Sequence, residues 1–283
     1  GFFAKKKFKC KFFFDVRDIW PMSFTSILGY SKYNPFIVIL RWIEKLGYRK
    51  ADYITSCTPY LNRHIEKSIK KPFKFIWVSH GFDKSFMDNQ QKLDASFIKK
   101  YTPENKFIVA YTGNIGIPFN YSMMLKCIEA LQYKHDDIHF LILGEGTYKS
   151  VCMEGAKGLN NITFIPKIPK SQLQDFLSYC DLLMNFYLDK EVFKFGVHPQ
   201  KMIDYLYAEK PVLTSCSEYD SLLVESNCGV SVPANDVEAF NRELLKIKQL
   251  PYEERIAMGK RGKKYLLDNL SWEKLAKKYI DLF

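Results

Sequence analysis

Short apolar runs alternate with helical patterns along the second part of the chain. Buried parallel strands are predicted at 106–111, 138–143, 161–166, 181–186, 211–215 and 229–232. Helices are predicted between these strands. One spans Tyr121 to Leu131, one follows the second strand and ends at about Lys157, one begins at a predicted cap at Ser171, and one covers 199–208. This rhythm predicts right-handed crossovers and a parallel sheet with helices on both faces.

The first hundred residues show a looser version of the pattern. Strands are predicted at 12–16, 52–57 and 73–79, with helices at 35–46, closed by Gly47, and at 59–69. Three strands are fewer than the five or six typical of an open α/β half. Because the first residue is Gly rather than Met, we expect the sequence to begin inside a longer reading frame.

The pattern divides the chain into three parts. Residues 1–100 form a partial Rossmann-like domain, 101–252 a second Rossmann-like domain, and 253–283 two helices that cross back toward the first. The predicted fold class is therefore α/β. Ser271 is expected to begin the last helix.

Composition narrows the class of protein. The longest apolar run, Pro35 to Leu40, is far shorter than the roughly 20 residues of a membrane span, and the first residues do not resemble a signal peptide. The seven cysteines are all more than three residues apart, which predicts buried thiols in a cytoplasmic protein rather than a CxxC motif.

Charge is unevenly distributed. Residues 1–100 carry 20 Lys and Arg against 8 Asp and Glu, whereas the rest carries 22 against 23. The basic residues alternate with Phe at 5–14 and 67–77, a mixture that favours an anionic membrane surface over nucleic acid. A buried strand with a solvated basic flank explains each segment equally well.

Two glycine-containing loops follow successive predicted strands. They are Gly113-Asn114-Ile115-Gly116 and Gly144-Glu145-Gly146. Glycine allows a backbone to approach a ligand closely, and ligands of parallel sheets lie beyond the strand ends. Neither loop is a GxGxxG or a Walker motif, so hydride transfer and P-loop hydrolysis are poorly supported.

A third loop leads into the helix at 199–208. Lys201 and Asp204 are three residues apart and share one side of that helix, where they could reach a phosphate and a ribose together. The alternative is an ion pair between the two. His198 and Gln200 are candidates to face the sugar.

These loops carry a family resemblance. The runs YTGNIG (111–116), LILGEG (141–146), ITFIPKIPKSQL (162–173), PQKMIDYLYAEKPVL (199–213) and CGVSV (228–232) resemble the nucleotide-sugar-binding half of a GT-B glycosyltransferase of family 4, group 1. DVRDIWP (15–21) and WVSHGFD (77–83) resemble the later part of its acceptor half. The most similar branch builds bacterial surface polysaccharides such as O-antigen and capsule.

The resemblance implies roles for individual residues. The donor diphosphate would face the backbone of Gly113 to Gly116, and the nucleotide would lie close to Gly144 to Gly146. The base would lie along Lys167 and Ile168, and Asp204 would bind the ribose. The family's first acid is absent, because Gly196 stands eight positions before Asp204. Asn114 and Phe119 stand where the family often has Arg and Lys, so Lys201 is the nearest replacement cation.

The resemblance also implies a mechanism. A retaining transfer from a UDP-sugar needs no enzyme nucleophile, and Lys201 would stabilise the departing diphosphate. The sequence contains no Asp-x-Asp motif, so no metal or other cofactor is expected. Arg17 and Asp18 follow a strand end, where they would hold acceptor or sugar, or form an ion pair with each other.

The expected partners are a nucleotide-sugar donor, a lipid-linked saccharide acceptor and the inner face of the cytoplasmic membrane, without nucleic acid. Two alternatives remain open. One is a GT-B sugar-nucleotide epimerase, and the other is an inactive fragment that binds a nucleotide-sugar.

Overall fold

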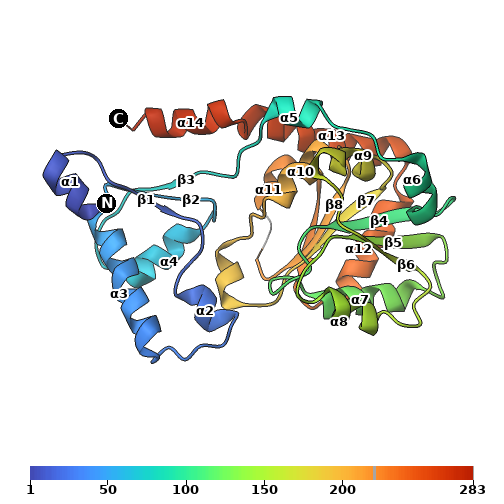
Figure 1. The fold of residues 1–283 in the computed structure, drawn as a ribbon, viewed down its shortest axis with the longest axis horizontal. Helices are drawn as coiled ribbons and strands as arrows, with labels where there is room; N and C mark the ends of the chain where they lie inside the picture. Colours follow the sequence, from blue (N-terminus) through green and yellow to red (C-terminus); the bar gives the residue numbers. More distant parts are fainter. Residues whose placement is uncertain (219–220, 283) are drawn as a thin grey trace.

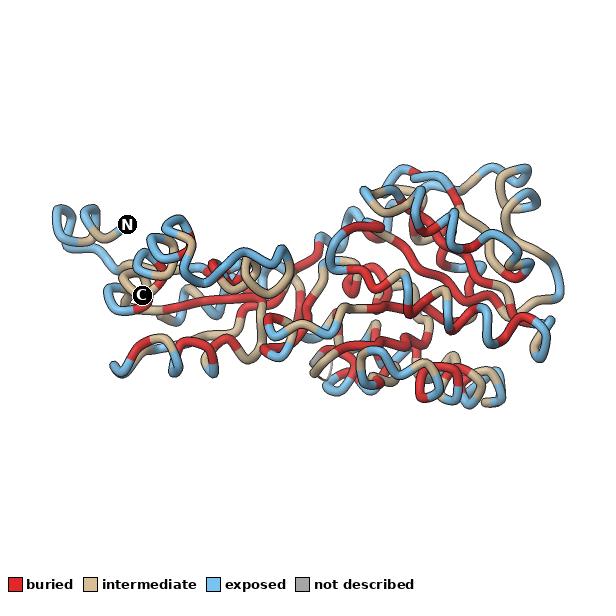
Figure 2. The backbone as a smooth tube through the Cα atoms, turned by 90° about the horizontal axis from the view of Figure 1, so that it is seen from below, coloured by how far each residue is buried: buried red, intermediate tan, exposed pale blue. Residues whose placement is uncertain are grey.

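The chain forms two parallel β-sheets, shown in Figure 1 by a computed structural model that describes residues 1–218 and 221–282. The predicted α/β class, with a parallel sheet in each half, is confirmed. Figure 2 shows that much of the buried backbone follows the strands, while many helices keep an exposed outer side.

The larger sheet has the strand order β6-β5-β4-β7-β8-β9. Its strands are β4 (Phe107–Thr112), β5 (Ile138–Leu143), β6 (Ile162–Ile165), β7 (Leu182–Phe186), β8 (Val212–Cys216) and β9 (Gly229–Pro233). The sheet grows from β4 toward one edge and then from β7 toward the other, so the winding direction reverses between β4 and β7. Ligands of open parallel sheets bind beyond the carboxyl ends of the strands at such a point.

Helices cover both faces of this sheet because the side chains of its strands alternate. Ile108 and Ala110 face a core shared with α9, α10, α11 and α13, whereas Val109 and Tyr111 face one shared with α7 and α12. The helices of this half are α7 (Tyr121–Leu131), α8 (Lys149–Gly155), α9 (Leu173–Ser178), α10 (Lys201–Tyr207), α11 (Ser221–Ser226), α12 (Val237–Gln249) and α13 (Tyr252–Asn269). Two 3-10 turns are η1 (Lys170–Gln172) and η2 (Glu191–Phe195).

The smaller sheet contains β1 (Phe13–Val16), β2 (Tyr53–Ser56) and β3 (Phe75–Trp77), paired in parallel in that order. Its two faces carry different helices (Figure 1). Phe14 contacts Tyr48 of α3, and Phe13 contacts Tyr279 of α14, with ring centroids 5.7 and 6.0 Å apart. The helices of this half and of the link are α1 (Phe2–Phe8), α2 (Met22–Ser26), α3 (Pro35–Lys50), α4 (Leu61–Ser68), α5 (Lys84–Asp88) and α6 (Ala95–Tyr101).

Two further segments join the halves. Val192 and Phe195 of η2 belong to the core of the smaller half. Helix α14 (Trp272–Ile280) runs back along the smaller sheet, where the Lys278 ammonium donates to the Trp77 carbonyl at 3.2 Å. Ser271 begins this helix as predicted, because its hydroxyl accepts from the Lys274 N–H.

Two helix boundaries were predicted wrongly. The helix predicted to close at Gly47 continues to Lys50. A Cβ at Gly47 would lie only 2.4 Å from the Phe14 ring. The glycine therefore permits close packing on β1 instead of ending the helix. Ser171 lies inside η1 and donates to the Gln91 side chain at 3.2 Å, so it caps no helix.

Other sequence predictions concern cysteines and membrane spans. Six of the seven cysteines are buried, as predicted, and Cys10 is exposed. Among the described residues, no helix is both long and apolar enough to cross a bilayer. Several short helices, including α1 and α2, were not predicted from the sequence.

Candidate active site

A cavity of about 600 Å³ lies beyond the carboxyl ends of β4, β5 and β6. It stands at the winding reversal of the larger sheet, where a ligand is expected. The residues predicted to bind the donor that line it are Gly113, Asn114, Gly144, Glu145, Lys167, Ile168, Gln200, Lys201 and Asp204. Four other residues predicted to bind the donor do not line this cavity, namely Ile115, Gly116, Gly146 and His198.

The two glycine loops pack directly on each other. A Cβ at Gly144 would lie 1.9 Å from the Gly113 carbonyl oxygen, and one at Gly146 would lie 2.3 Å from the Ile115 carbonyl oxygen. Both glycines also have positive φ, at 149° and 158°. They are thus needed for loop-to-loop contact, in addition to any approach to a ligand.

Two N–H groups of the first glycine loop donate to the second loop and to the end of β5. The Gly113 N–H donates to the Leu143 carbonyl at 3.0 Å, and the Ile115 N–H donates to the Glu145 carbonyl at 2.8 Å. The side chain of Ile115 is fully buried. These two N–H groups are therefore already used inside the protein, and the prediction that residues 113–116 face a diphosphate concerns the rest of the loop backbone.

Lys201 is a half-buried cation that lines the cavity. Its ammonium lies 3.7 Å from the centre of the Tyr111 ring, which stacks on Phe119 at 4.1 Å. Among the described residues, no carboxylate lies within ion-pair distance of this ammonium. Burial lowers the pKa of Lys201 to about 7. An anionic ligand would restore the charged form.

Asp204 is buried beside a different lysine. Its carboxylate, only 4% exposed, forms an ion pair with Lys170. Burial raises the pKa of Asp204, and the charge of Lys170 acts in the opposite direction. An ion pair between Lys201 and Asp204, the alternative left open by the sequence, is therefore wrong.

Lys170 was not among the predicted residues, although the sequence contained a signal for it. It follows β6 in the run PKIPK and lies three residues after Lys167, at the same strand end. Both lysines line the cavity with Lys201. Of the two lining carboxylates, Asp204 holds Lys170, and Glu145 holds Lys149 at 2.6 Å. The arrangement favours an anionic ligand.

A second cavity, of about 390 Å³, lies between the halves and contains Arg17, Asp18 and His198. His198 was predicted to bind the donor, but it faces this second cavity. Its Nε2 contacts the Ser79 hydroxyl at 2.6 Å and accepts from the His80 N–H at 3.3 Å. Burial, followed by the nearby charge of His80, lowers the pKa of His198 to about 3, so the ring is neutral.

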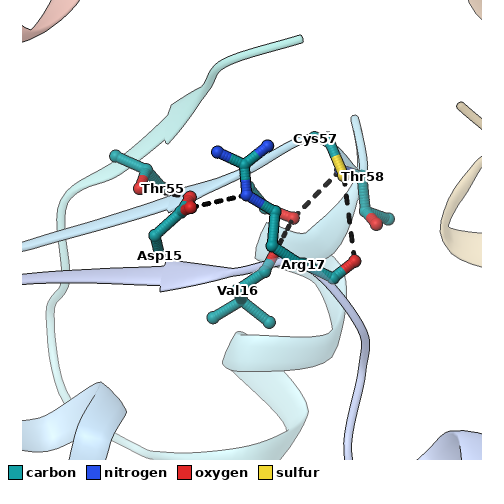
Figure 3. A network of polar contacts seen from close by, with 7 residues as sticks. Asp15, Val16, Arg17, Thr55, Cys57 and Thr58 are labelled. Atoms are coloured by element: carbon teal, nitrogen blue, oxygen red, sulfur yellow. Dashed lines mark hydrogen bonds and ion pairs between the residues drawn. The ribbon is translucent and has the colours of Figure 1, made fainter. Parts of the chain in front are cut away.

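Arg17 is held by Asp15 rather than by Asp18. Its Nε lies 2.6 Å from the Asp15 carboxylate, which also accepts from the Thr55 hydroxyl at 2.8 Å. Figure 3 shows the two terminal nitrogens of Arg17 pointing away from that carboxylate. Asp18 is exposed. The predicted catalytic residues Lys201, Arg17 and Asp18 thus lie in two cavities, not one.

One loop forms a wall of both cavities. Gly196, His198 and Pro199 line the second cavity, and Gln200 and Lys201 line the first. Gly196 has φ 93°, and a Cβ there would lie 2.5 Å from Cγ of Pro59. This packing explains why no acid stands at the position.

Metal ligands do not cluster in the described part of the chain: no group of three or more His, Cys, Asp or Glu residues could hold an ion. The residues that converge on the larger cavity are lysines, an aspartate and loop glycines.

The fold and the cavity define an α/β protein of two parallel-sheet halves, with a lysine-lined cavity at the strand ends of the larger sheet. The model of the family described as "Glycosyl transferases group 1" matches residues 94–265, more than half of the chain. The chain therefore belongs to the group 1 glycosyltransferases.

Solved structures agree on a GT-B fold. Sucrose-phosphate synthase from Thermosynechococcus elongatus is similar with a TM-score of 0.73 at 14% identity, over 99% of this chain and 70% of that one. HepE of Anabaena, solved with UDP and glucose, is similar with a TM-score of 0.72 at 13% identity, over 100% of this chain and 73% of that one. WaaG, a glycosyltransferase involved in lipopolysaccharide biosynthesis, is similar with a TM-score of 0.68 at 15% identity, over 95% of this chain and 74% of that one. No curated protein sequence matches significantly.

Proposed function

We propose that this chain transfers a hexosyl or N-acetylhexosaminyl group, with retention, from a UDP-sugar to a lipid-linked saccharide. The reaction belongs to the synthesis of a bacterial surface polysaccharide such as O-antigen, capsule or lipopolysaccharide. It takes place at the inner face of the cytoplasmic membrane, and the enzyme is a peripheral member of family 4.

The observation that carries this proposal is the ammonium of Lys201, which lines a lysine-rich cavity at the winding reversal of the larger sheet. Desolvation lowers its pKa to about 7, and it has no carboxylate partner in the described part of the chain. A buried cation is costly unless a ligand neutralises it, and a diphosphate supplies that charge. HepE, a structural neighbour, was solved with UDP and glucose, which supports a nucleotide-sugar donor.

The chemistry follows from where charge develops. When the glycosidic bond breaks, negative charge grows on the departing diphosphate, and fixed lysines in a cavity of low dielectric stabilise it. Lys201 and Lys170, which line the cavity, would supply this positive charge, and Asp204, which lines it too, would accept hydrogen bonds from the ribose. A departing phosphate oxygen takes the proton of the acceptor hydroxyl.

The second cavity is the proposed acceptor side. Arg17, fixed by Asp15, has N–H groups left to donate to a saccharide or a phosphate. His80 lines the same cavity and was not predicted from the sequence. Burial, followed by the charge of Arg17, lowers the pKa of His80, so its neutral ring can exchange a proton or hydrogen bond with a sugar hydroxyl.

Calorimetric titration with UDP, followed by product analysis, tests the proposal. We expect UDP to bind equally well with and without EDTA, and UDP to be released only when a lipid-linked acceptor is glycosylated. Binding that disappears in EDTA would contradict the metal-free mechanism. An altered UDP-sugar formed without acceptor would indicate an epimerase, and binding without turnover would indicate an inactive fragment.

A further inference from the structure

Helix α3 is apolar on the side that faces away from the protein. Its inner side is anchored by Ile37, Glu44 and Tyr48. Its outer side carries Phe36, Val38, Ile39, Trp42 and Ile43, each 49–65% exposed. Such a contiguous exposed apolar face in a soluble protein usually marks an interaction surface.

A groove rich in cations runs along one flank of this face. It has a volume of about 550 Å³, and its cations are Lys32, Arg41, Lys45 and Lys67. Two carboxylates also line it. Glu44 accepts from the Tyr48 hydroxyl at 3.0 Å and pairs with His64 at 2.7 Å, and Glu191 is the second. The groove therefore has an excess of cations beside an apolar helix face.

Aromatic residues that precede α3 are also exposed. Trp20 comes just before α2, and Tyr30 and Tyr33 lie in the loop between α2 and α3. Their exposed fractions are 46–77%, and Tyr30 also lines the groove. Figure 1 shows α2, this loop and the start of α3 at one border of the smaller half, on the side of the smaller sheet away from α14. Trp and Tyr with neighbouring Lys and Arg are typical of protein surfaces at the lipid–water boundary.

The two basic segments predicted to contact lipid are partly used inside the protein. Lys5 pairs with Asp52 at 2.6 Å, and Lys71 donates to the Arg49 carbonyl at 3.2 Å. Strand β3 lies within the second segment and β1 begins at the end of the first, where the alternative interpretation predicted strands, but both strands are mostly half-buried rather than buried. The lipid-contacting surface is better sought on α3.

We infer that the outer face of α3 docks on an anionic phospholipid bilayer, with a lipid phosphate in the cation groove. Arg41 and Lys45 lie on the helix that carries Trp42, so apolar insertion and phosphate binding occur together. The inference rests on the proposed function, because a lipid-linked acceptor is found only at a bilayer. Docking by α3 would hold the cavity between the halves near that acceptor.

Co-sedimentation with phosphatidylcholine vesicles, with and without phosphatidylglycerol, tests the inference. Ile39→Glu/Trp42→Glu should reduce binding to the anionic vesicles by roughly tenfold or more. The matched control, Tyr133→Glu/Val224→Glu, alters side chains of the larger half that are 83% and 57% exposed and should bind like wild type. Equal binding by the α3 variant, or an equal loss in the control, would overturn the inference.

A second pair of variants, matched in their change of charge, tests whether the cations of the groove contribute to vesicle binding. Arg41→Glu/Lys45→Glu should weaken vesicle binding roughly tenfold or more, and by clearly more than Lys70→Glu/Lys74→Glu. A greater loss in the second pair would place lipid contact on the basic segments and contradict the inference. UDP titration of every variant separates the two proposals: retained UDP binding without vesicle binding rejects only the docking surface.

Fluorescence gives a measurement that does not depend on a disruptive variant. Brominated phosphatidylglycerol should quench the wild-type protein, and Trp20→Phe/Trp42→Phe should remove most of that quenching. Trp272→Phe in α14 should not. Equal quenching in Trp20→Phe/Trp42→Phe and Trp20→Phe would show that α3 stays outside the bilayer. Conversion of a dimer to a monomer by Ile39→Glu/Trp42→Glu, with vesicle binding intact, would identify α3 as a self-association face instead.

Discussion

Lys201 carries the main electrostatic cost of the larger cavity. Its ammonium has the Tyr111 ring beneath it and no carboxylate partner among the described residues, and burial holds its pKa at about 7. Phe119 stacks on the Tyr111 ring with centroids 4.1 Å apart. The stacked rings of Tyr111 and Phe119 thus help to position the Lys201 ammonium at the larger cavity.

Donor binding should depend on pH through Lys201. Below pH 7 the lysine is protonated in the free protein, so affinity is at its maximum. Above pH 7 the free protein must take up a proton to bind a diphosphate, so affinity falls, by about tenfold or more at pH 9. Calorimetry should use UDP-glucose, whose phosphates are both esterified and do not titrate near pH 6. A pH-independent affinity, or the same pH profile in Lys201→Met, would contradict the assignment.

The same residue should limit stability. Because the folded pKa of Lys201 lies below the unfolded value of 10.5, its cost is fully present below pH 7 and disappears as pH rises toward 10.5. Lys201→Met should therefore stabilise the protein near pH 7, by about 1–3 kcal/mol, and not above pH 10.5. Urea unfolding at the two pH values measures this. A destabilised variant at pH 7 would mean that the ammonium contributes favourably to folding.

At the level of elements, the loop from η2 to α10 links the two halves. Val192 and Phe195 pack in the smaller core, and the next residues form walls of both cavities. The close approach of Gly196 to Pro59 fixes where this loop crosses. An acid at that position would need both a positive φ and space that Pro59 occupies.

Gly196→Ala should destabilise the protein more than Gly158→Ala does. Both glycines have positive φ, 93° at Gly196 and 87° at Gly158. An added methyl group would contact Pro59 at Gly196, whereas at Gly158 no atom lies within 4 Å of the added methyl group. The shared backbone strain is about 1 kcal/mol, and the contact with Pro59 adds about 1–3 kcal/mol at Gly196. Thermal unfolding of both variants measures the difference, and equal losses would show that Pro59 moves aside.

The sequence predicted the larger sheet well because its buried strands are short, apolar and regularly spaced, as at 138–143. It identified the cavity because residues at the carboxyl ends of parallel strands must meet. It could not predict that Asp204 would pair with Lys170 instead of Lys201, since that pairing depends on the position of η1 beside α10. It also could not assign His198 to the second cavity, because the contact with Ser79 joins residues 119 positions apart.

At the scale of the molecule, two halves of different charge face each other across the second cavity. The excess of cations lies in residues 1–100, which also contain α3 and the cations of its groove, whereas the larger half is nearly neutral and holds the larger cavity. Helix α14 and η2 tie the halves together. This division suits an enzyme that meets an anionic surface with one half and a soluble nucleotide-sugar with the other.

The most direct measurement compares UDP and uridine binding to two variants by calorimetry. Lys201→Ala should weaken UDP by more than tenfold, about 1.5–3 kcal/mol, and leave uridine nearly unchanged, because only UDP has the diphosphate. Asp204→Ala should weaken both ligands, because both contain the ribose. Equal losses of UDP and uridine in Lys201→Ala would show that this lysine does not contact the diphosphate.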